Sequence, residues 1–554
     1  MCSSDLSGFA LTFGGAGDVN VSGALVLGSA ALAKDGAGTL SLQTANTLTG
    51  AVTVAAGTLN LRNSGALGAA TGVTAEAGSA VQLQGTITVA GIPLVAPLLQ
   101  NVSGNNAWSG AISPRSGGAL TLQSDAGALA ITGSLTATGL DAVARTLTLT
   151  GAGDGSLANA VTGAASLVKS GAGAWTLGAA NTYSVATSVN AGTLRAGVAG
   201  AFSPNSVFTL TNTANATLDL NDTAQTLVAL EGAGATGGSV RLGSTGALTV
   251  GANTSYNGNI VGTALGTGSV TKTGSGTFTL GSASTLTGTF AVNVNAGRFV
   301  FGGNGGANVA VNVASGATLA GTGTLLGTTT LASGATLQAG NGAGGPIAAS
   351  TLVFAGAATL RLADIDLGSA SILNAGALTL NGAAGSVVIY ASKSGALANG
   401  VYDLITYSTL GGAGGFSALT TSAGSIAGLS GRQSGTLNDT GTKITLTVAG
   451  DSVRWHGDVG GVADNVWHGA SSGLQNFRLV PGGGATDFQL ADAVVFNDLA
   501  ATGTVLLSEA DVVPSSVTFA NATLDYAFSG SKGITGSTGI VKNGAAAVTF
   551  ANTE

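Results

Sequence analysis

The sequence predicts an all-β chain that is wound into a solenoid of stacked parallel coils. Three observations support this fold class: related segments recur along all 554 residues, short runs alternate polar and aliphatic residues, and only 7% of the residues are charged. A stack of coils can lengthen without limit, whereas a closed barrel cannot absorb a repetition that continues through the whole chain. We therefore expect an elongated solenoid with no closed barrel in this chain.

The composition suits a narrow core that is built from small side chains. Hydrophobic residues make up 45% of the chain but aromatic residues only 5%, and 93 glycines stand against 7 prolines. This profile is neither disordered nor collagen-like. Stacked coils place equivalent side chains about 4.8 Å apart, where like charges would repel each other. Neutral Thr, Ser and Asn are expected to hydrogen-bond to their equivalents in the coils above and below.

The charge and cysteine content argue against several classes of protein. The 17 basic and 24 acidic residues give a net charge of −7 without basic runs, so we expect no nucleic-acid partner. Cys2 is the single cysteine, which rules out an intramolecular disulfide framework. The first residues lack the basic and apolar regions of a signal peptide, and no apolar stretch of about 18 residues predicts a membrane-spanning helix. Nothing in the sequence requires a cofactor.

One segment recurs at residues 34–61, 169–197 and 272–300. Each copy opens on a lysine in K-x-G-x-G or a close variant, continues with an alternating run, and ends in Ala-Gly followed by a second alternating run. A fourth copy opens at Lys542. Because the copies are unevenly spaced, the structural unit is a single coil. At roughly 20 to 25 residues per coil, the chain would form on the order of 25 coils and a rod somewhat over 100 Å long.

The copies also agree at single polar and glycine positions. Asn46 and Asn181 lie at the same offset from their lysines, and Ser284 replaces the asparagine in the third copy. The glycine of the closing Ala-Gly lies two residues later in the third copy, at Gly297. Glycine and asparagine tolerate positive φ angles, and Asn and Ser side chains bond to nearby backbone in tight turns. These positions are therefore expected in turns.

The alternating runs predict strands with one dry and one wet face. In GTLNL, residues 57–61, Leu59 and Leu61 are expected to point into the core, while Thr58 and Asn60 face solvent. Similar runs recur as GTLSL, ATLDL, GALTL and ATLRL. No segment keeps a 3.6-residue period over the length of a helix.

The repeat resembles the autotransporter-associated β-strand repeat of passenger domains, the secreted parts of outer-membrane autotransporters. The resemblance is carried by K-x-G-x-G, A-N-T-Y and N-A-G-T-L-R, and is closest over residues 175–195. The region that begins with V-R-W-H-G is similar to a linking module between such repeats. We therefore expect a repeat-bearing solenoid over residues 1–450, a Trp-containing linking module of the same solenoid over 451–530, and the truncated start of a further repeat over 531–554.

The resemblance implies a right-handed parallel β-helix that is displayed on, or secreted from, the surface of a Gram-negative-type bacterium through its outer membrane. It implies a non-enzymatic structural stalk or adhesin-like rod. The full-length protein would carry an outer-membrane β-barrel, and we expect this chain to be a fragment that lacks sequence at both ends, the signal peptide and barrel included. The partner stays open: a host or neighbouring cell surface, glycans, or another copy of the chain.

Four residues form the sharpest candidate for a metal site. His456, Asp458, Asp464 and His468 lie close in sequence, and imidazoles and carboxylates are metal ligands. The same segment contains the tripeptide W-H-G twice. We interpret its tryptophans as structural residues and its histidines as outward-facing side chains, so we assign no metal, catalytic or cofactor-binding residues.

A carbohydrate-active β-helix enzyme, a polysaccharide lyase or hydrolase, is the alternative function. Such enzymes need paired carboxylates, or a basic residue beside a carboxylate. Asp364 and Asp366 are expected on one strand face because they lie two residues apart. No second acidic cluster completes a site, so the non-enzymatic interpretation is preferred.

Overall fold

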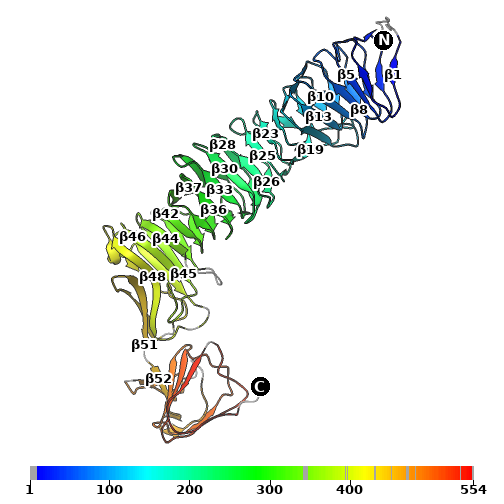
Figure 1. The fold of residues 1–554 in the computed structure, drawn as a ribbon. Coiled ribbons are helices and arrows are strands. Elements are labelled where there is room, and N and C mark those ends of the chain that lie inside the picture. Colours follow the sequence, from blue (N-terminus) through cyan, green and yellow to red (C-terminus); the bar gives the residue numbers. More distant parts are fainter. Residues whose placement is uncertain are drawn as a thin grey trace. The chain divides into compact units, whose positions relative to one another are not determined.

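The computed structural model describes residues 9–340, 347–393, 395, 397–429, 432–450, 452–468, 473–480, 482–536 and 538–551. Parallel stacked strands form a β-solenoid of about 24 turns, which confirms the predicted fold class. The one helix in these ranges is a 3-10 turn at Gly415–Ala418, and none is long and apolar enough to cross a membrane. The chain divides into two compact units, residues 1–312 and 313–554, which are taken in turn below (Figure 1).

In the first unit, successive coils each contribute a strand to the same parallel sheets (Figure 1). Short strands suit this arrangement, because each coil must turn a corner after only a few residues. One sheet consists of β1 (Leu11–Phe13), β4 (Leu32–Lys34), β7 (Val52–Val54), β9 (Val73–Ala75), β12 (Leu94–Val95), β15 (Ile112–Ser113), β18 (Leu135–Thr136) and β21 (Val161–Thr162).

A second sheet of this unit shows how the core is filled. It includes β5 (Thr39–Leu42), β8 (Thr58–Leu61), β10 (Ala80–Gln84), β13 (Leu98–Ser103) and β16 (Leu120–Ser124). In register, these strands stack one fully buried aliphatic side chain on the next, in the order Leu40, Leu59, Val81, Leu99 and Leu122. Along these strands the core is thus a column of aliphatic side chains.

The outward face of the same strands carries a ladder of side-chain amides. The Asn60 amide donates to Gln82 Oε1 at 3.0 Å, and the Gln82 amide donates to Gln100 Oε1 at 2.9 Å. Gln100 donates in turn to Asp125 Oδ2 at 2.5 Å. The predicted bonding between equivalent polar residues is therefore present. The predicted solvent exposure of Asn60 is wrong, because its neighbours in the ladder leave it only 3% exposed.

The second unit contains two parallel ladders of longer strands. One consists of β41 (Thr318–Gly321), β43 (Ala335–Ala339), β45 (Ala358–Ala363), β47 (Val387–Ser392) and β49 (Leu419–Thr420). The other consists of β42 (Thr324–Leu331), β44 (Ile347–Phe354), β46 (Leu373–Leu380) and β48 (Gly400–Gly411). Both place alternate aliphatic side chains in the core.

Parallel pairing in the second of these ladders gives way to antiparallel pairing. β48 pairs antiparallel with β51 (Lys443–Gly450), which pairs antiparallel with β50 (Gln433–Asp439). A tight turn joins β50 to β51, in which Gly441 has a φ of +90° and its N–H donates to Asp439 Oδ1 at 2.8 Å. A hairpin returns the chain beside itself instead of advancing it by one coil. The sequence did not indicate this, because alternation is the same for both pairing directions.

Residues 452–550 form separate sheets with their own core. Three parallel strands, β57 (Ala493–Asn497), β59 (Ser516–Ala520) and β61 (Gly539–Lys542), belong to one sheet, and β58 (Thr504–Leu506), β60 (Tyr526–Ser529) and β62 (Val548–Phe550) form another. The core between them is aromatic and contains both tryptophans of the W-H-G tripeptides. Its rings belong to Trp455, Trp467, Phe477, Phe488, Phe496, Phe519, Tyr526 and Phe528.

Candidate functional site: a buried-lysine corner

The K-x-G-x-G segments form sharp corners between two strands. β22 (Ala164–Lys169) ends on its lysine, and β23 (Ala174–Leu177) begins directly after the second glycine. Equivalent corners join β4 to β5, and β34 (Gly268–Lys272) to β35 (Thr277–Leu280). The three lysines are buried, with exposed fractions of 3% for Lys34, 0% for Lys169 and 1% for Lys272. Lysine is almost never buried without partners, so each corner must satisfy an ammonium group.

The Lys169 ammonium is bound by three backbone carbonyl groups. Nζ donates to the oxygens of Ser170 and Gly171, both at 2.8 Å, and to that of Ala191 at 2.9 Å. An ammonium group has three N–H donors, so all of them are used. Ser170 and Gly171 belong to the lysine's own corner, whereas Ala191 belongs to the Ala-Gly turn one coil later. The lysine therefore ties together the opening and closing turns of one repeat.

The other two buried lysines make the same bridge. The bonds run from Lys272 Nζ to the carbonyls of Gly274 at 2.9 Å and Ala296 at 3.5 Å, and from Lys34 Nζ to those of Gly36 and, at 3.3 Å, Ala56. Backbone carbonyls in a buried turn need donors, because an unsatisfied buried polar group costs about 1–3 kcal/mol. The lysines supply donors to two coils at once.

The protonation of these lysines follows from their burial. Burial lowers the pKa of Lys169 to about 8, and the charge of Asp154 opposes that shift. Burial also lowers the pKa of Lys272. A group with a pKa of about 8 is mostly protonated at pH 7, so the Lys169 side chain keeps the three donors that its carbonyl partners need.

A side chain from the preceding coil caps each corner. Its oxygen accepts a hydrogen bond from the backbone N–H that starts the strand after the corner. The pairs are Asp18 with Thr39 (2.7 Å), Asp154 with Ala174 (2.9 Å), Asn253 with Thr277 (2.6 Å) and Asp525 with Ala547 (2.7 Å). Sequence reasoning missed these residues, because their distance from the lysine varies from copy to copy. The sequence pattern that could have located them is an Asp or Asn at the end of the turn in the preceding coil.

The closing Ala-Gly turn needs its glycine. Gly192 has a φ of +65°, and a Cβ atom there would overlap the carbonyl oxygen of Gly171. Gly57 and Gly297 have the same conformation, and a Cβ at either would likewise overlap carbonyl oxygens of the preceding corner. Gly297 thus occupies the equivalent place although its copy is two residues longer. The coil absorbs the extra length elsewhere.

The repeated asparagine forms hydrogen bonds to both neighbouring coils and so links three coils. Asn181 Oδ1 accepts from the N–H of Val161 at 2.8 Å, and its Nδ2 donates to the carbonyl of Ala201 at 2.7 Å. Asn46 makes equivalent bonds to the coils before and after it. Ser284, which replaces the asparagine in the third copy, donates to the Tyr256 carbonyl at 3.1 Å. Its shorter side chain therefore bridges two coils instead of three.

The four candidate metal ligands fall into two separate groups. His456 Nδ1 lies 2.5 Å from Asp458 Oδ1, and Asp458 also forms an ion pair with Arg478. Burial alone would raise the pKa of Asp458, but the His456 hydrogen bond and the Arg478 charge hold it below its usual value. In the part of the chain that the structure describes, no three His, Cys, Asp or Glu side chains are placed to hold a metal ion.

His468 forms the second group. Its Nε2 lies 2.7 Å from Asp464 Oδ2, and its Nδ1 lies 2.8 Å from Glu509 Oε1. The two carboxylates contact opposite nitrogens of the ring. Burial of the ring lowers its pKa, but the hydrogen bonds and charges of Asp464 and Glu509 outweigh this and raise it. The prediction that this histidine faces outward is wrong, because the two carboxylates cover it.

The two aspartates of the enzyme alternative do not share a strand face. β45 ends at Ala363, and Asp364 follows with a φ of +60°, which places it in a turn. Asp366 forms an ion pair with Lys393 at 2.7 Å. The expected placement on one strand face is therefore wrong. A left-handed residue interrupts the alternation on which that expectation depended.

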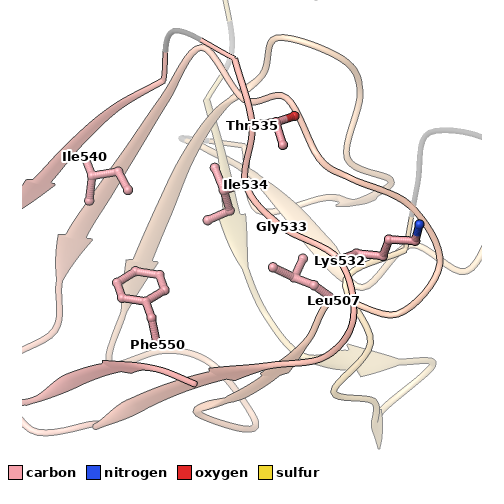
Figure 2. Close-up of a pocket in the computed structure, with 7 residues that line it drawn as sticks. All are labelled: Leu507, Lys532, Gly533, Ile534, Thr535, Ile540 and Phe550. Atoms are coloured by element: carbon pink, nitrogen blue, oxygen red, sulfur yellow. The ribbon is translucent and has the colours of Figure 1, made fainter. Parts of the chain in front are cut away.

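A cavity lies beside the last strands of residues 452–550. Figure 2 shows Leu507, Ile534, Ile540 and Phe550 around this hollow of about 350 Å³. Ile540 and Phe550 are both about half exposed. The lining is mainly apolar, so the cavity lacks the set of converging polar groups that would orient a ligand.

Comparison with known proteins assigns the repeats. The family model of the passenger-associated-transport-repeat matches residues 32–61, 167–196 and 270–300. These ranges contain the three buried-lysine corners together with their closing Ala-Gly turns. The chain carries autotransporter passenger repeats. The predicted identification as an autotransporter passenger domain is thus confirmed.

A curated relative supports the same assignment. This chain is 37% identical over 174 residues to the adhesin BmaC autotransporter of Brucella suis biovar 1 (strain 1330). The aligned region covers 31% of this chain and 4% of that protein. The fourth copy, at Lys542, lies outside the matched ranges, but it shares the capping bond between Asp525 and Ala547. The family model and the relative both indicate an autotransporter passenger.

Proposed function

We propose that this chain is a non-enzymatic passenger segment that acts as a structural stalk or adhesin-like rod outside the bacterial cell. The observation that carries the proposal is the internal use of the repeat's polar groups. The Lys169 ammonium would be the natural reactive group of its repeat. All three of its N–H donors are hydrogen-bonded to carbonyl groups of the turns. The repeats therefore serve to lock coils together.

The route of delivery is part of the proposal. Passenger repeats occur in proteins that cross the outer membrane, and a solenoid held by contacts between neighbouring coils can form progressively as each coil emerges. We propose display on the cell surface, or release from it, through an outer-membrane β-barrel of the full-length protein. Its partner would be a host or neighbouring cell surface, a glycan, or a second copy of the chain.

Surface display and attachment test the proposal together. Residues 1–554 would be fused between the signal peptide and the β-barrel of another autotransporter and produced in a laboratory Gram-negative bacterium. We expect the segment to be labelled by antibody on intact cells and to increase attachment to surfaces or to other cells. The matched control carries the same barrel without the segment.

Two results would contradict the proposal. Retention of the segment inside the cell, with the barrel control displayed normally, would remove the passenger assignment. Cleavage of a polysaccharide by the purified chain would replace the non-enzymatic interpretation with the lyase or hydrolase alternative. The geometry does not favour paired carboxylates, because Asp364 has a left-handed backbone and does not share a strand face with Asp366.

A further inference from the structure

Three polar side chains stand in register on the outer face of the second unit. β43, β45 and β47 pair in parallel so that Gln338 lies opposite Arg361, and Arg361 lies opposite Tyr390. The neighbouring positions, Leu360 and Ile389, are fully buried. Alternation therefore turns the guanidinium and the phenol ring outward.

The Arg361 guanidinium contacts an aromatic ring. Its guanidinium carbon lies 4.6 Å from the centre of the Tyr390 ring, a cation–π contact. Among the residues described, it takes part in no salt bridge. The arginines that do form one are Arg115, Arg145, Arg195, Arg432 and Arg478. The planar N–H donors of Arg361 thus remain available to an anion.

A hollow of about 180 Å³ lies beside this arginine and tyrosine. It arises because β49 is only two residues long and covers Val387 and Val388 of β47 but not Tyr390. Beyond β49 the chain loops out and returns only at the bridge between Ala391 and Ile426. The walls also include Ser392, which adds a hydroxyl group, and Ser425, whose buried hydroxyl oxygen already accepts from the Ser422 N–H at 2.9 Å.

The lining matches the chemistry of an acidic sugar. A guanidinium binds a carboxylate through two parallel hydrogen bonds, which a point charge cannot do. An aromatic ring offers an apolar face to the C–H groups of a pyranose, and hydroxyl groups of Tyr and Ser can donate to or accept from sugar hydroxyls. Typical pockets for drug-sized ligands measure roughly 300–1,000 Å³, so this smaller hollow suits a single sugar ring.

Of the two basic side chains near this hollow, Arg361 is the one that can attract an anion. Lys393 follows Ser392 in the chain but is already paired with Asp366 at 2.7 Å. Since the protein as a whole carries a net charge of −7, recognition must depend on this local contact and not on a general basic surface.

We propose that Arg361 and Tyr390 form a binding site for one carboxylated pyranose unit, such as a uronic acid residue of an acidic polysaccharide. Arg361 binds the carboxylate, Tyr390 packs on the ring, and Ser392 binds a hydroxyl group. The inference rests on the proposed adhesin-like function and names a ligand class for it.

Binding of glucuronate and of a short oligogalacturonate to the purified chain tests this site, with ligand-observed NMR and calorimetry as readouts. We expect the wild type to bind both acidic ligands and to bind glucose and galactose at least ten-fold more weakly. Arg361→Gln should reduce affinity for the acidic ligands at least ten-fold, and Tyr390→Leu several-fold. Tyr390→Phe keeps the ring and should retain most of the affinity.

Arg241→Gln is the matched control, because Arg241 is an exposed strand arginine in the first unit and should not affect binding. Circular dichroism melting would check that each variant folds. Absence of wild-type binding, equal binding of neutral sugars, tighter binding of a sulfated sugar, or unchanged affinity in Arg361→Gln would each overturn the site. None of these results affects surface display, so the failure of this inference is distinguishable from that of the proposed function.

Discussion

In the first unit, coils with a mainly aliphatic core are joined at their corners by buried ammonium groups and side-chain amides, whereas residues 452–550 have a core that is rich in packed aromatic rings. Lys169 and Asn181 satisfy backbone groups of neighbouring coils. Trp455 and Phe477, by contrast, pack edge to face with ring centres 5.2 Å apart. Both regions stack parallel strands. The comparison teaches that stacked coils can be stabilised either by hydrogen bonds to the backbone groups of their turns or by packing of aromatic rings in their core.

Removing a central ring should have the largest effect. Trp455→Ala leaves a cavity among packed aromatic rings and should cost about 3–5 kcal/mol of the stability of residues 452–550. Hydrogen exchange measured by mass spectrometry on the whole chain would localise the loss. The corners around Lys169 should keep their protection. A uniform loss across the chain would contradict the view that the two regions have independent cores.

Removing a corner lysine should have the next largest effect. Lys169→Met leaves the carbonyls of Ser170, Gly171 and Ala191 without a donor, and we expect a local loss of about 3 kcal/mol. Amide exchange in the two turns should speed up on the order of 100-fold.

Lys542→Met is the matched control for that lysine. Lys542 opens the fourth copy but is exposed, and within the part of the chain that the structure describes it bonds only to the Gly544 carbonyl of its own corner. We expect a change below about 0.5 kcal/mol. Equal effects of the two substitutions would show that the bridge to the following coil contributes nothing.

The closing glycine should come third. Gly192→Ala imposes a left-handed alanine and an overlap with the Gly171 carbonyl, so a loss of about 2 kcal/mol is expected. Gly117→Ala isolates the overlap, because Gly117 has a φ of +77° with open space around its Cβ position, and should cost about 1 kcal/mol. Chemical denaturation monitored by hydrogen exchange would compare the two. If they were equally destabilised, close packing of the turns would not matter.

The histidine between two carboxylates should give the smallest effect and one that depends on pH. Because Asp464 and Glu509 raise the pKa of folded His468, its contribution to stability is complete below the unfolded pKa of 6.5. It is lost as the pH rises through the higher folded value. His468→Gln should remove this pH dependence from thermal unfolding of residues 452–550. Identical pH profiles for the variant and the wild type would refute the assignment.

The extent of agreement between sequence and structure differs along the chain. Alternation correctly located strands such as Thr58–Leu61, because the strand period depends on local backbone geometry. It failed at Asn60 and at Asp364, for two different reasons. Asn60 is covered by residues of neighbouring coils, and Asp364 itself adopts a left-handed backbone conformation that alternation does not encode.

The candidate site was predictable only in part. The opening lysine and the closing Ala-Gly were visible as repeated letters, so their importance could be read directly. Their contact was not visible, since Lys169 and Ala191 meet only when one coil lies on the next. Asp154, which caps the corner from the coil before, was missed because turn lengths shift its offset. Arg361 and Tyr390 are neighbours only because the register of β45 and β47 places them opposite each other.

The sequence by itself determined the solenoid fold, the approximate number of coils and the family, because local periodicity, turn residues and repeated motifs are properties of neighbouring positions. Only the tertiary structure decided that Lys169 is buried, that His456 and His468 lie in separate groups, and that β48, β50 and β51 pair antiparallel. The physical reason is register. Which residue lies above which is set by the summed lengths of all the turns between them, and it is established only when the coils stack.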